Sequence, residues 1–327
     1  MIARAALVLF AGATMLAASA DAWGQPTRPP RVGVLLPGGL GANDPFSVAL
    51  KEGLQPLGFS EARRTVAFEF RNAEGHRERL RSLAEDLVRA KVDVIVAGGD
   101  DAIAAAKEST ATLPIVMIAS DAVAAGFVGN LARPMGNLTG VTCVISDLSA
   151  KRLELLKEIF PKLVRVGVIL NPGDRRARTE LAETELAGRT LKVAIRAIPL
   201  VRHEDFGPAF AMAVAERSEA LVVAYDELTL NGRQQFAGLA RAHRQATVHN
   251  FSEYVLAGGL VSYGPSLAGM WRMAAGHVAK VLNGARPADL PIEQPTRFEL
   301  VINRKTEKAL GIVIPRSVLL RADVVIE

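Results

Sequence analysis

Small, amide and acidic side chains follow the hydrophobic runs of this sequence, where a folded chain would present donors and acceptors to a small molecule. In the first half they are Gly38 and Gly39, Gly99 and Asp100, and Ser120 and Asp121; in the second half they are Asn171, Tyr225 and Asp226, and Asn250. Glycines let backbone N–H groups approach an anion at a helix N-terminus, and Asp121 or Asp226 would neutralise an ammonium group. Further along, Tyr263 would stack on an apolar or aromatic solute. The set predicts non-covalent binding of a small solute.

Each of these residues also has a structural interpretation. The glycines fit tight turns, and Asp100 and Asp226 stand where helix N-caps are expected. Tyr225 and Tyr263 fit the edge of a hydrophobic core. The pattern leaves both interpretations open for each residue.

Motifs of catalysis and metal binding are missing from the sequence. The run VGVLLPGGLG lacks the G-x-G-x-x-G spacing of a dinucleotide fingerprint, and neither a phosphate-binding G-x-x-x-x-G-K-[ST] loop nor a G-x-S-x-G elbow is present. The five histidines are scattered without a partner at i+4 or a C-x-x-C companion. We therefore expect no enzyme, no metal and no cofactor. A secreted Rossmann-like enzyme is a weaker hypothesis than a solute-binding subunit or a sensing module.

The hydrophobic runs that position these residues occur twice, in the same order. RVGVLLPGG at residues 31–39 returns as RVGVILNPG at 165–173, VDVIVAGGDD at 92–101 as EALVVAYDEL at 219–228, and PIVMIASD at 114–121 as the weaker ATVHNFSE at 246–253. Strands alternate with helical patterns throughout, which is typical of parallel βαβ units. Because ligands bind at the carboxyl ends of such strands, two similar rims would face each other across a cleft.

The sequence thus predicts an α/β protein of two doubly wound, Rossmann-like lobes. Residues 129–147, 258–266 and 288–295 interrupt the alternation and are the three expected crossovers. We expect the N-terminal lobe to comprise residues 31–142 plus 260–290, and the C-terminal lobe 143–259 plus 291–327.

The charge pattern argues against a nucleic-acid partner. The formal net charge is +5, from 39 Lys and Arg and 34 Asp and Glu, but opposite charges are interleaved, as in ERLRSLAEDLVRAK at residues 78–91. Nucleic-acid-binding proteins cluster their positive charge instead. The basic side chains are therefore interpreted as solvated helix faces.

The N-terminus has the pattern of a cleaved secretion signal. Arg4 precedes an apolar stretch over residues 5–18, which is too short to span a bilayer, and Ala18-Ser19-Ala20 is a small-x-small cleavage site. We expect residues 1–20 to be the signal peptide; an uncleaved membrane anchor is the alternative. Cys143 is the only cysteine, which excludes an intramolecular disulfide, and its apolar neighbours favour a buried structural thiol.

Taken in order, several blocks carry a family resemblance: RVGVLLPGG, VDVIVAGGDDAIAAAK, LPIVMIAS, LARPMGNLTGV, SAKRLELLKEIFPKLVRVGVILNP, AGGLVSYGPSL, GARPADLPIEQPTRFELVINRKTEKALGI and LLRADVVIE. From about residue 31 to residue 327 the chain resembles the bacterial ABC-transporter substrate-binding proteins of the tryptophan/tyrosine type. The resemblance implies a type 1 periplasmic-binding-protein fold whose two lobes, joined by three crossovers, close on a small solute. It also implies delivery of that solute to a membrane permease.

These observations lead to one functional hypothesis and one alternative. We expect a periplasmic, monomeric solute-binding subunit that captures an amino acid or aromatic compound and serves an ABC permease and its ATPase. The alternative is a secreted sensing module that presents its closed state to a receptor. Only the partner distinguishes these two roles.

Overall fold

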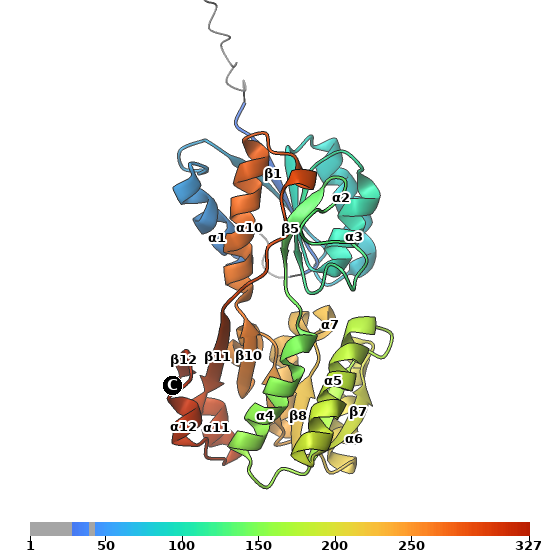
Figure 1. The fold of residues 1–327 in the computed structure, drawn as a ribbon, viewed down its shortest axis with the longest axis vertical. Helices are drawn as coiled ribbons and strands as arrows, with labels where there is room; N and C mark the ends of the chain where they lie inside the picture. The colour runs from blue at the N-terminus through green and yellow to red at the C-terminus, as the bar shows by residue number, and fades with distance from the viewer. Residues whose placement is uncertain (1–27, 39–42) are drawn as a thin grey trace, which may run out of the picture.

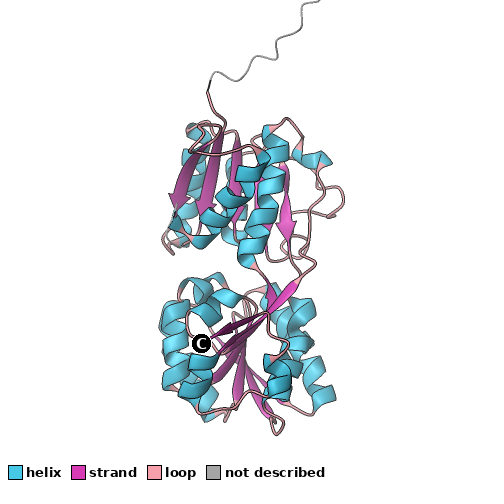
Figure 2. Cartoon of the chain, turned by 90° about the vertical axis from the view of Figure 1, so that its left-hand side faces the viewer, coloured by secondary structure: helices cyan, strands magenta, loops and turns pink. Residues whose placement is uncertain are grey.

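The chain forms two α/β lobes, stacked end to end, in a computed structural model that describes residues 28–38 and 43–327 (Figure 1). The expected signal peptide and Gly39 lie outside the described residues. Each lobe has a central sheet with helices on both faces (Figure 2). The predicted two-lobed α/β fold is confirmed.

The first lobe has a five-stranded parallel sheet in the order β2-β1-β3-β4-β5. Its strands are β1 (Arg31–Leu36), β2 (Ala67–Asn72), β3 (Val94–Gly98), β4 (Ile115–Ala119) and β5 (Leu138–Thr142). The helices of this lobe are α1 (Pro45–Leu54), α2 (Leu80–Arg89), α3 (Asp100–Ser109) and, from much later in the sequence, α10 (Leu267–Leu282). The β3 and β4 strands are buried along their whole length, because helices cover both faces of the sheet.

The second lobe repeats this topology and extends it. Its seven-stranded sheet has the order β12-β11-β10-β9-β8-β6-β7, with β11 antiparallel to β10. The strands are β6 (Arg165–Leu170), β7 (Ala194–Pro199), β8 (Ala220–Val223), β9 (Ala246–His249), β10 (Val261–Pro265), β11 (Phe298–Asn303) and β12 (Val324–Ile326). The helices are α4 (Ser149–Ile159), α5 (Arg175–Leu191), α6 (Phe206–Ala215), α7 (Glu227–Asn231), α8 (Arg233–Ala242), α9 (Ser252–Leu256), α11 (Arg304–Leu310) and α12 (Arg316–Leu319).

The sequence echo corresponds to equivalent strands in the two sheets. In order of appearance, the first five strands of each lobe are arranged 2-1-3-4-5, so β1 matches β6, β3 matches β8 and β4 matches β9. In this topology the strand order reverses between the first and third strands, and ligands bind at that point, beyond the carboxyl ends. The repeat therefore places the two predicted rims at equivalent positions.

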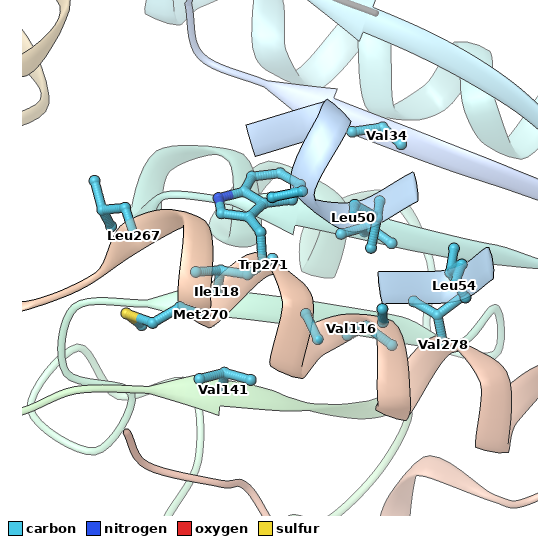
Figure 3. Packing of buried hydrophobic residues seen from close by; sticks show 14 of the residues in the cluster. Val34, Leu50, Leu54, Val116, Ile118, Val141, Leu267, Met270, Trp271 and Val278 are labelled. Carbon is cyan, nitrogen blue, oxygen red and sulfur yellow. The ribbon is translucent and has the colours of Figure 1, made fainter. Parts of the chain in front are cut away.

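Helix α10 completes the hydrophobic core of the first lobe. It packs along α1, with Leu54 and Val278 side by side over Val116 and with Trp271 near Ile118 (Figure 3). On the opposite face of the sheet, α2 and α3 cover a separate cluster of buried side chains. The first lobe thus contains a helix that the chain supplies only after it has built most of the second sheet.

The lobe boundary expected at residue 260 is wrong by one strand. Residues 261–265 form β10, which pairs with β9 and β11 inside the second sheet, so the chain crosses to the first lobe only at Ser266, the N-cap of α10. The other two crossovers follow β5 and precede β11. Ile292 still packs in the core of the first lobe, and Glu293 bridges to Val141 of β5, so the return crossover begins after residue 293.

Candidate functional site

A narrow cavity lies between the lobes at the carboxyl ends of β1, β3, β4 and β8, and we call it the inner cavity. Its volume is about 70 Å³, several times the roughly 10–15 Å³ that one water molecule needs. Most of its lining is aliphatic or aromatic: Leu36, Phe46, Ile118, Leu267, Met270 and Trp271 from the first lobe, and Tyr225, Leu230 and Phe251 from the second. Such a cavity suits an apolar or aromatic group.

Trp271 forms one wall of the inner cavity because the neighbouring strand ends in a glycine. A Cβ atom on Gly98 would lie 2.2 Å from the Trp271 ring, so any other residue at the end of β3 would displace the indole. On its other side the indole stacks on Phe46, with ring centroids 6.0 Å apart and an interplanar angle of 9°. The wall is therefore a pair of fixed aromatic rings carried by α10 and α1.

Glu227 is the acidic residue that the second lobe contributes to the lining of the inner cavity. It is the first residue of α7, and its Oε1 accepts a long hydrogen bond of 3.5 Å from the Asp101 N–H in the first turn of α3. Withdrawal from water and the nearby Asp101 carboxylate raise the pKa of Glu227 to about 8. Because this carboxyl group is costly to ionise, a cation placed beside it would stabilise its charged form.

Gly99 and Gly38 lie at two places where the second lobe contacts the first. Gly99 has a φ of +86°, and a Cβ atom there would lie 2.5 Å from Glu227 Oε1; a Cβ atom on Gly38 would lie 2.6 Å from Asn231 Oδ1. Both ends of α7 thus rest against glycines that follow β3 and β1. The two lobes are therefore in contact at both ends of this helix.

Arg176, near the start of α5, joins the lobes by charge. Asp174 of its own lobe accepts from the guanidinium at 2.6 Å, and the same guanidinium contacts the Asp100 carboxylate and the Ser120 hydroxyl of the first lobe. Asp100 also accepts from the Ser120 hydroxyl at 2.9 Å. While the lobes are in contact, the side chains of Asp100 and Ser120 are engaged in this network.

A wide, polar outer cavity of about 730 Å³ lies beyond α7. It contains Asp100, Asn171 and Asp226 from the predicted set. Asp226 Oδ1 accepts from the Leu228 N–H at 2.7 Å as the N-cap of α7, and Asp226 Oδ2 accepts from the Asn171 amide at 3.3 Å. Burial raises the pKa of Asp226, which these hydrogen bonds oppose. The structural interpretation of Asp226, that of a helix cap, accounts for its contacts.

The structure divides the predicted site residues into groups. Gly38, Gly99, Ser120 and Tyr225 line the inner cavity, whereas Asp121 lines a third cavity beside the first crossover, which we call the side cavity. Asn250 is buried and donates to Glu180, and Tyr263 packs near Phe298 inside the second lobe with ring centroids 6.3 Å apart. Asn250 and Tyr263 are therefore turned into the second lobe and not toward the inner cavity.

Sequence reasoning missed the residues that give the inner cavity its chemical character. These are Phe46, Glu227, Asn231, Arg233 and Trp271. Glu227 belongs to the AYDEL run that the repeat had already marked, one position beyond the predicted Asp226. Trp271 had a weaker signal, because a tryptophan in an apolar helix fits a core position equally well.

Residues 28–38 and 43–327 contain neither a metal-binding cluster nor a membrane-spanning helix. In this part of the chain, His, Cys, Asp and Glu side chains form no group of three or more arranged to hold a metal ion. No helix here has the length and apolarity needed to cross a membrane. The lone Cys143 is buried, as predicted, and burial raises the pKa of its thiol.

Comparisons with known proteins agree with this geometry. A family model described as "ABC transporter substrate binding protein" matches residues 42–326. A tyrosine-binding protein of Clostridioides difficile is 26% identical over 246 residues, which cover 75% of this chain and 70% of that protein.

Two solved structures share the fold over 91% of this chain and 100% of their own. One is a conserved domain protein from Vibrio cholerae, with a TM-score of 0.81 and 26% identity. The other, described as an ABC domain in complex with L-Trp, comes from Streptococcus pneumoniae and has a TM-score of 0.82 and 23% identity.

Proposed function

Because the chain belongs to the ABC transporter substrate-binding protein family, we propose that it captures an amine-bearing solute with an aromatic or large apolar side chain between its lobes. Members of this family bind solutes and are not enzymes. The observation that carries the proposal is the inner cavity, where aromatic side chains of both lobes surround a space that also contains the Glu227 carboxyl.

The two ends of an amino acid find opposite charges in this cavity. We assign the ammonium group to Glu227, whose carboxyl is poorly solvated and would be ionised by a cation beside it. Arg233 also lines the inner cavity, and α3 begins at Asp100 with its N-terminus toward the cleft. A guanidinium and a helix N-terminus both attract a carboxylate.

The aromatic wall suits the side chain of the solute. Trp271 and Phe46 present stacked rings, and aromatic pairs contribute about 0.5–1.5 kcal/mol beyond the burial of apolar area. The tyrosine-binding relative from Clostridioides difficile supports an aromatic amino acid. We therefore propose tyrosine, tryptophan and phenylalanine as the first candidates.

Hinge closure is the proposed mechanism. A solute that contacts Trp271 of the first lobe and Glu227 of the second stabilises the closed arrangement, because these contacts exist together only when the lobes meet. We propose that a monomer, exported to the periplasm after removal of residues 1–20, then docks on an ABC permease served by an ATPase. Co-purification with a permease would support transport, whereas co-purification with a receptor would favour the sensing role.

A ligand series tests the proposed recognition. We expect L-tyrosine, L-tryptophan or L-phenylalanine to raise the melting temperature of the protein lacking residues 1–20, because a ligand at 100 times its Kd adds about 2.7 kcal/mol of stability. Tyramine should bind weakly and 3-(4-hydroxyphenyl)propionate, which has no ammonium group, more weakly still. Equal binding of the propionate and of L-tyrosine would contradict the role assigned to Glu227.

A matched variant pair tests the aromatic wall. Trp271→Leu removes the ring but keeps an apolar side chain, and we expect the Kd for an aromatic amino acid to rise at least tenfold. Met273→Leu, two residues along α10 and not in the lining of the inner cavity, is the control. An unchanged Kd for Trp271→Leu would remove this wall from the site.

A further inference from the structure

A fully buried ion pair lies behind the inner cavity, inside the second lobe. Arg152 of α4 and Glu180 of α5 form it, with 2.9 Å between Nη2 and Oε2 and side chains that are 0% and 3% exposed. Burial raises the pKa of Glu180 and lowers that of Arg152, and each partner opposes the shift of the other. Removing two charges from water is costly, and a well-packed apolar pair is often at least as stable.

The guanidinium of this pair contacts two carbonyl groups in segments near the first two crossovers. Arg152 donates to the Ile145 carbonyl at 3.0 Å, in the segment that leaves β5 for the second lobe. It also reaches the Tyr263 carbonyl at 3.5 Å, in β10, three residues before the chain crosses back at Ser266. One side chain therefore connects the first crossover to β10, the strand that leads into the second crossover.

The carboxylate of the pair faces the rim of the cleft. Glu180 Oε1 accepts from the Tyr225 N–H at 3.1 Å, directly after β8, and Glu180 Oε2 accepts from the Asn250 amide at 2.9 Å, directly after β9. Tyr225 lines both the inner cavity and the side cavity, and Glu180 lines the side cavity. The predicted rim residue Asn250 thus contributes through Glu180 and not by facing the inner cavity.

We propose that Arg152 and Glu180 are positioning residues that hold the Tyr225 wall of the inner cavity in register with the first crossover and with β10, the strand that leads into the second. The inference rests on the proposed solute-binding function. The pair would contribute to affinity without touching the solute. When it is intact, the hinge and the rim move as one body, so closure brings Tyr225 to a fixed place. Hydrogen bonds in the low-dielectric interior are electrostatically stronger than in water, which favours a fixed arrangement of the segments that this network joins.

Two single variants and their combination separate the positioning role of the pair from its effect on the stability of the fold. Arg152→Met and Glu180→Gln each leave one buried charge unpaired, and both should unfold at lower temperature than the natural protein. The double variant R152M/E180Q has neither charge and keeps an amide oxygen for the Tyr225 N–H. We expect its melting temperature to recover from the values of the single variants.

Affinity should not recover with it. We expect the Kd of R152M/E180Q for L-tyrosine, measured by calorimetry at 15 °C where all variants are folded, to remain at least tenfold above that of the natural protein. The control K151Q/E154Q removes an exposed ion pair of 3.0 Å from the same helix and should bind unchanged. A double variant that regains both melting temperature and affinity would overturn the proposal.

Hydrogen exchange of the ligand-free protein supplies a readout that needs no solute. In R152M/E180Q we expect faster exchange across residues 143–149 and at the Tyr225 amide, with β6 and β8 protected as in the control. If the natural protein binds none of the aromatic amino acids, the proposed function fails, and the exchange result still decides the positioning role. Exchange equal to that of the control at both segments would overturn that role.

Discussion

Two adjacent acids after β8 have different roles, and only the folded chain separates them. Asp226 is the N-cap of α7 and accepts from the Leu228 N–H, whereas Glu227, the first residue of the helix, faces the inner cavity. The sequence places an acid at the correct rim, but the side chain that faces the cavity depends on where α7 begins. Helix boundaries are the least certain part of a sequence-based prediction, and here one position changes the chemistry.

Substitution of these two acids should give opposite results. We expect Glu227→Gln to raise the Kd for an aromatic amino acid roughly ten- to hundredfold, since a hydrogen bond to a charged group contributes about 1.5–3 kcal/mol. Asp226→Ala should instead lower the free energy of unfolding by about 1 kcal/mol through loss of the cap, with a smaller change in Kd. Calorimetry and urea unfolding measure the two effects; a Kd within twofold of the natural value for Glu227→Gln would exclude its role.

Gly38 offers a test of closure at a single atom. Gly38→Ala adds a Cβ atom 2.6 Å from Asn231 Oδ1, across the contact between the lobes, which the proposed hinge motion would open. We expect weaker solute binding, by about 1 kcal/mol or roughly fivefold, because overpacking costs about 1–3 kcal/mol and the Asn231 side chain can partly yield. The double variant G38A/N231A should recover most of the affinity, and Gly207→Ala, with open space around its Cβ, should have none of the effect. Loss of affinity without recovery in the double variant would locate the fault elsewhere.

At the scale of elements, the repeat in the sequence predicted the sheets well and the helices that cover them less well. Strands β1, β3 and β4 and their counterparts β6, β8 and β9 occupy equivalent places, as the echo indicated. Strand β10 was placed in the wrong lobe, because its partner β11 follows about 30 residues later and nothing in the pattern of β10 itself specifies an antiparallel neighbour. Trp271 escaped prediction for another reason: its helix was expected in the first lobe, but a tryptophan in an apolar helix fits a core position as well as a cavity wall.

The contact of α1 with α10 predicts a contrast between two glycines. A Cβ atom on Gly53 of α1 would lie 2.8 Å from Ala275 Cβ and 3.1 Å from the Arg272 carbonyl oxygen, so Gly53→Ala should separate the helices and lower the free energy of unfolding by about 1 kcal/mol or more. Gly276→Ala, on α10 with no atom within 4 Å of its Cβ, should raise that free energy by about 0.5–1 kcal/mol through helix propensity. Urea unfolding compares them; stabilisation by both substitutions would show that the helices are not in close contact.

At the scale of the whole molecule, the lobes meet through charged groups. Arg176 contacts Asp100 and Ser120 across the cleft, and Glu227 contacts the first turn of α3. The two-lobed architecture and the location of the cleft were predictable from strand ends, because parallel strands present their carboxyl ends to one edge. The cross-cleft contacts were not, since they join residues 56 to 126 positions apart whose relative placement is set by the crossovers.

This arrangement predicts a conformational response to pH. In the closed arrangement the pKa of Glu227 is raised from 4.5 to about 8 by withdrawal from water and by Asp101, with Asp226 adding to the rise and Arg176 opposing it; in an open cleft the carboxyl is solvated and titrates near 4.5. A raised pKa stabilises the closed state fully below the open-state value, and that contribution is lost as pH rises toward 8. We expect the ligand-free protein to have a smaller radius of gyration at pH 5 than at pH 8.5 by X-ray scattering. The Glu227→Gln variant should show a smaller difference, with the remainder from Asp101 and Asp226, whose pKa values burial also raises. An equal difference in the variant would assign the response to groups other than Glu227.

The late position of α10 in the sequence also has a consequence for biosynthesis. The first lobe obtains Leu267, Met270, Trp271, Ala274 and Val278 of its core from a helix that ends at residue 282. Domains ordinarily fold in the order of their synthesis, but here the leading domain lacks one side of its core until most of the polypeptide has been translated. A nascent chain of this kind remains without a finished N-terminal globule, which is the condition that a narrow translocation channel requires of its cargo.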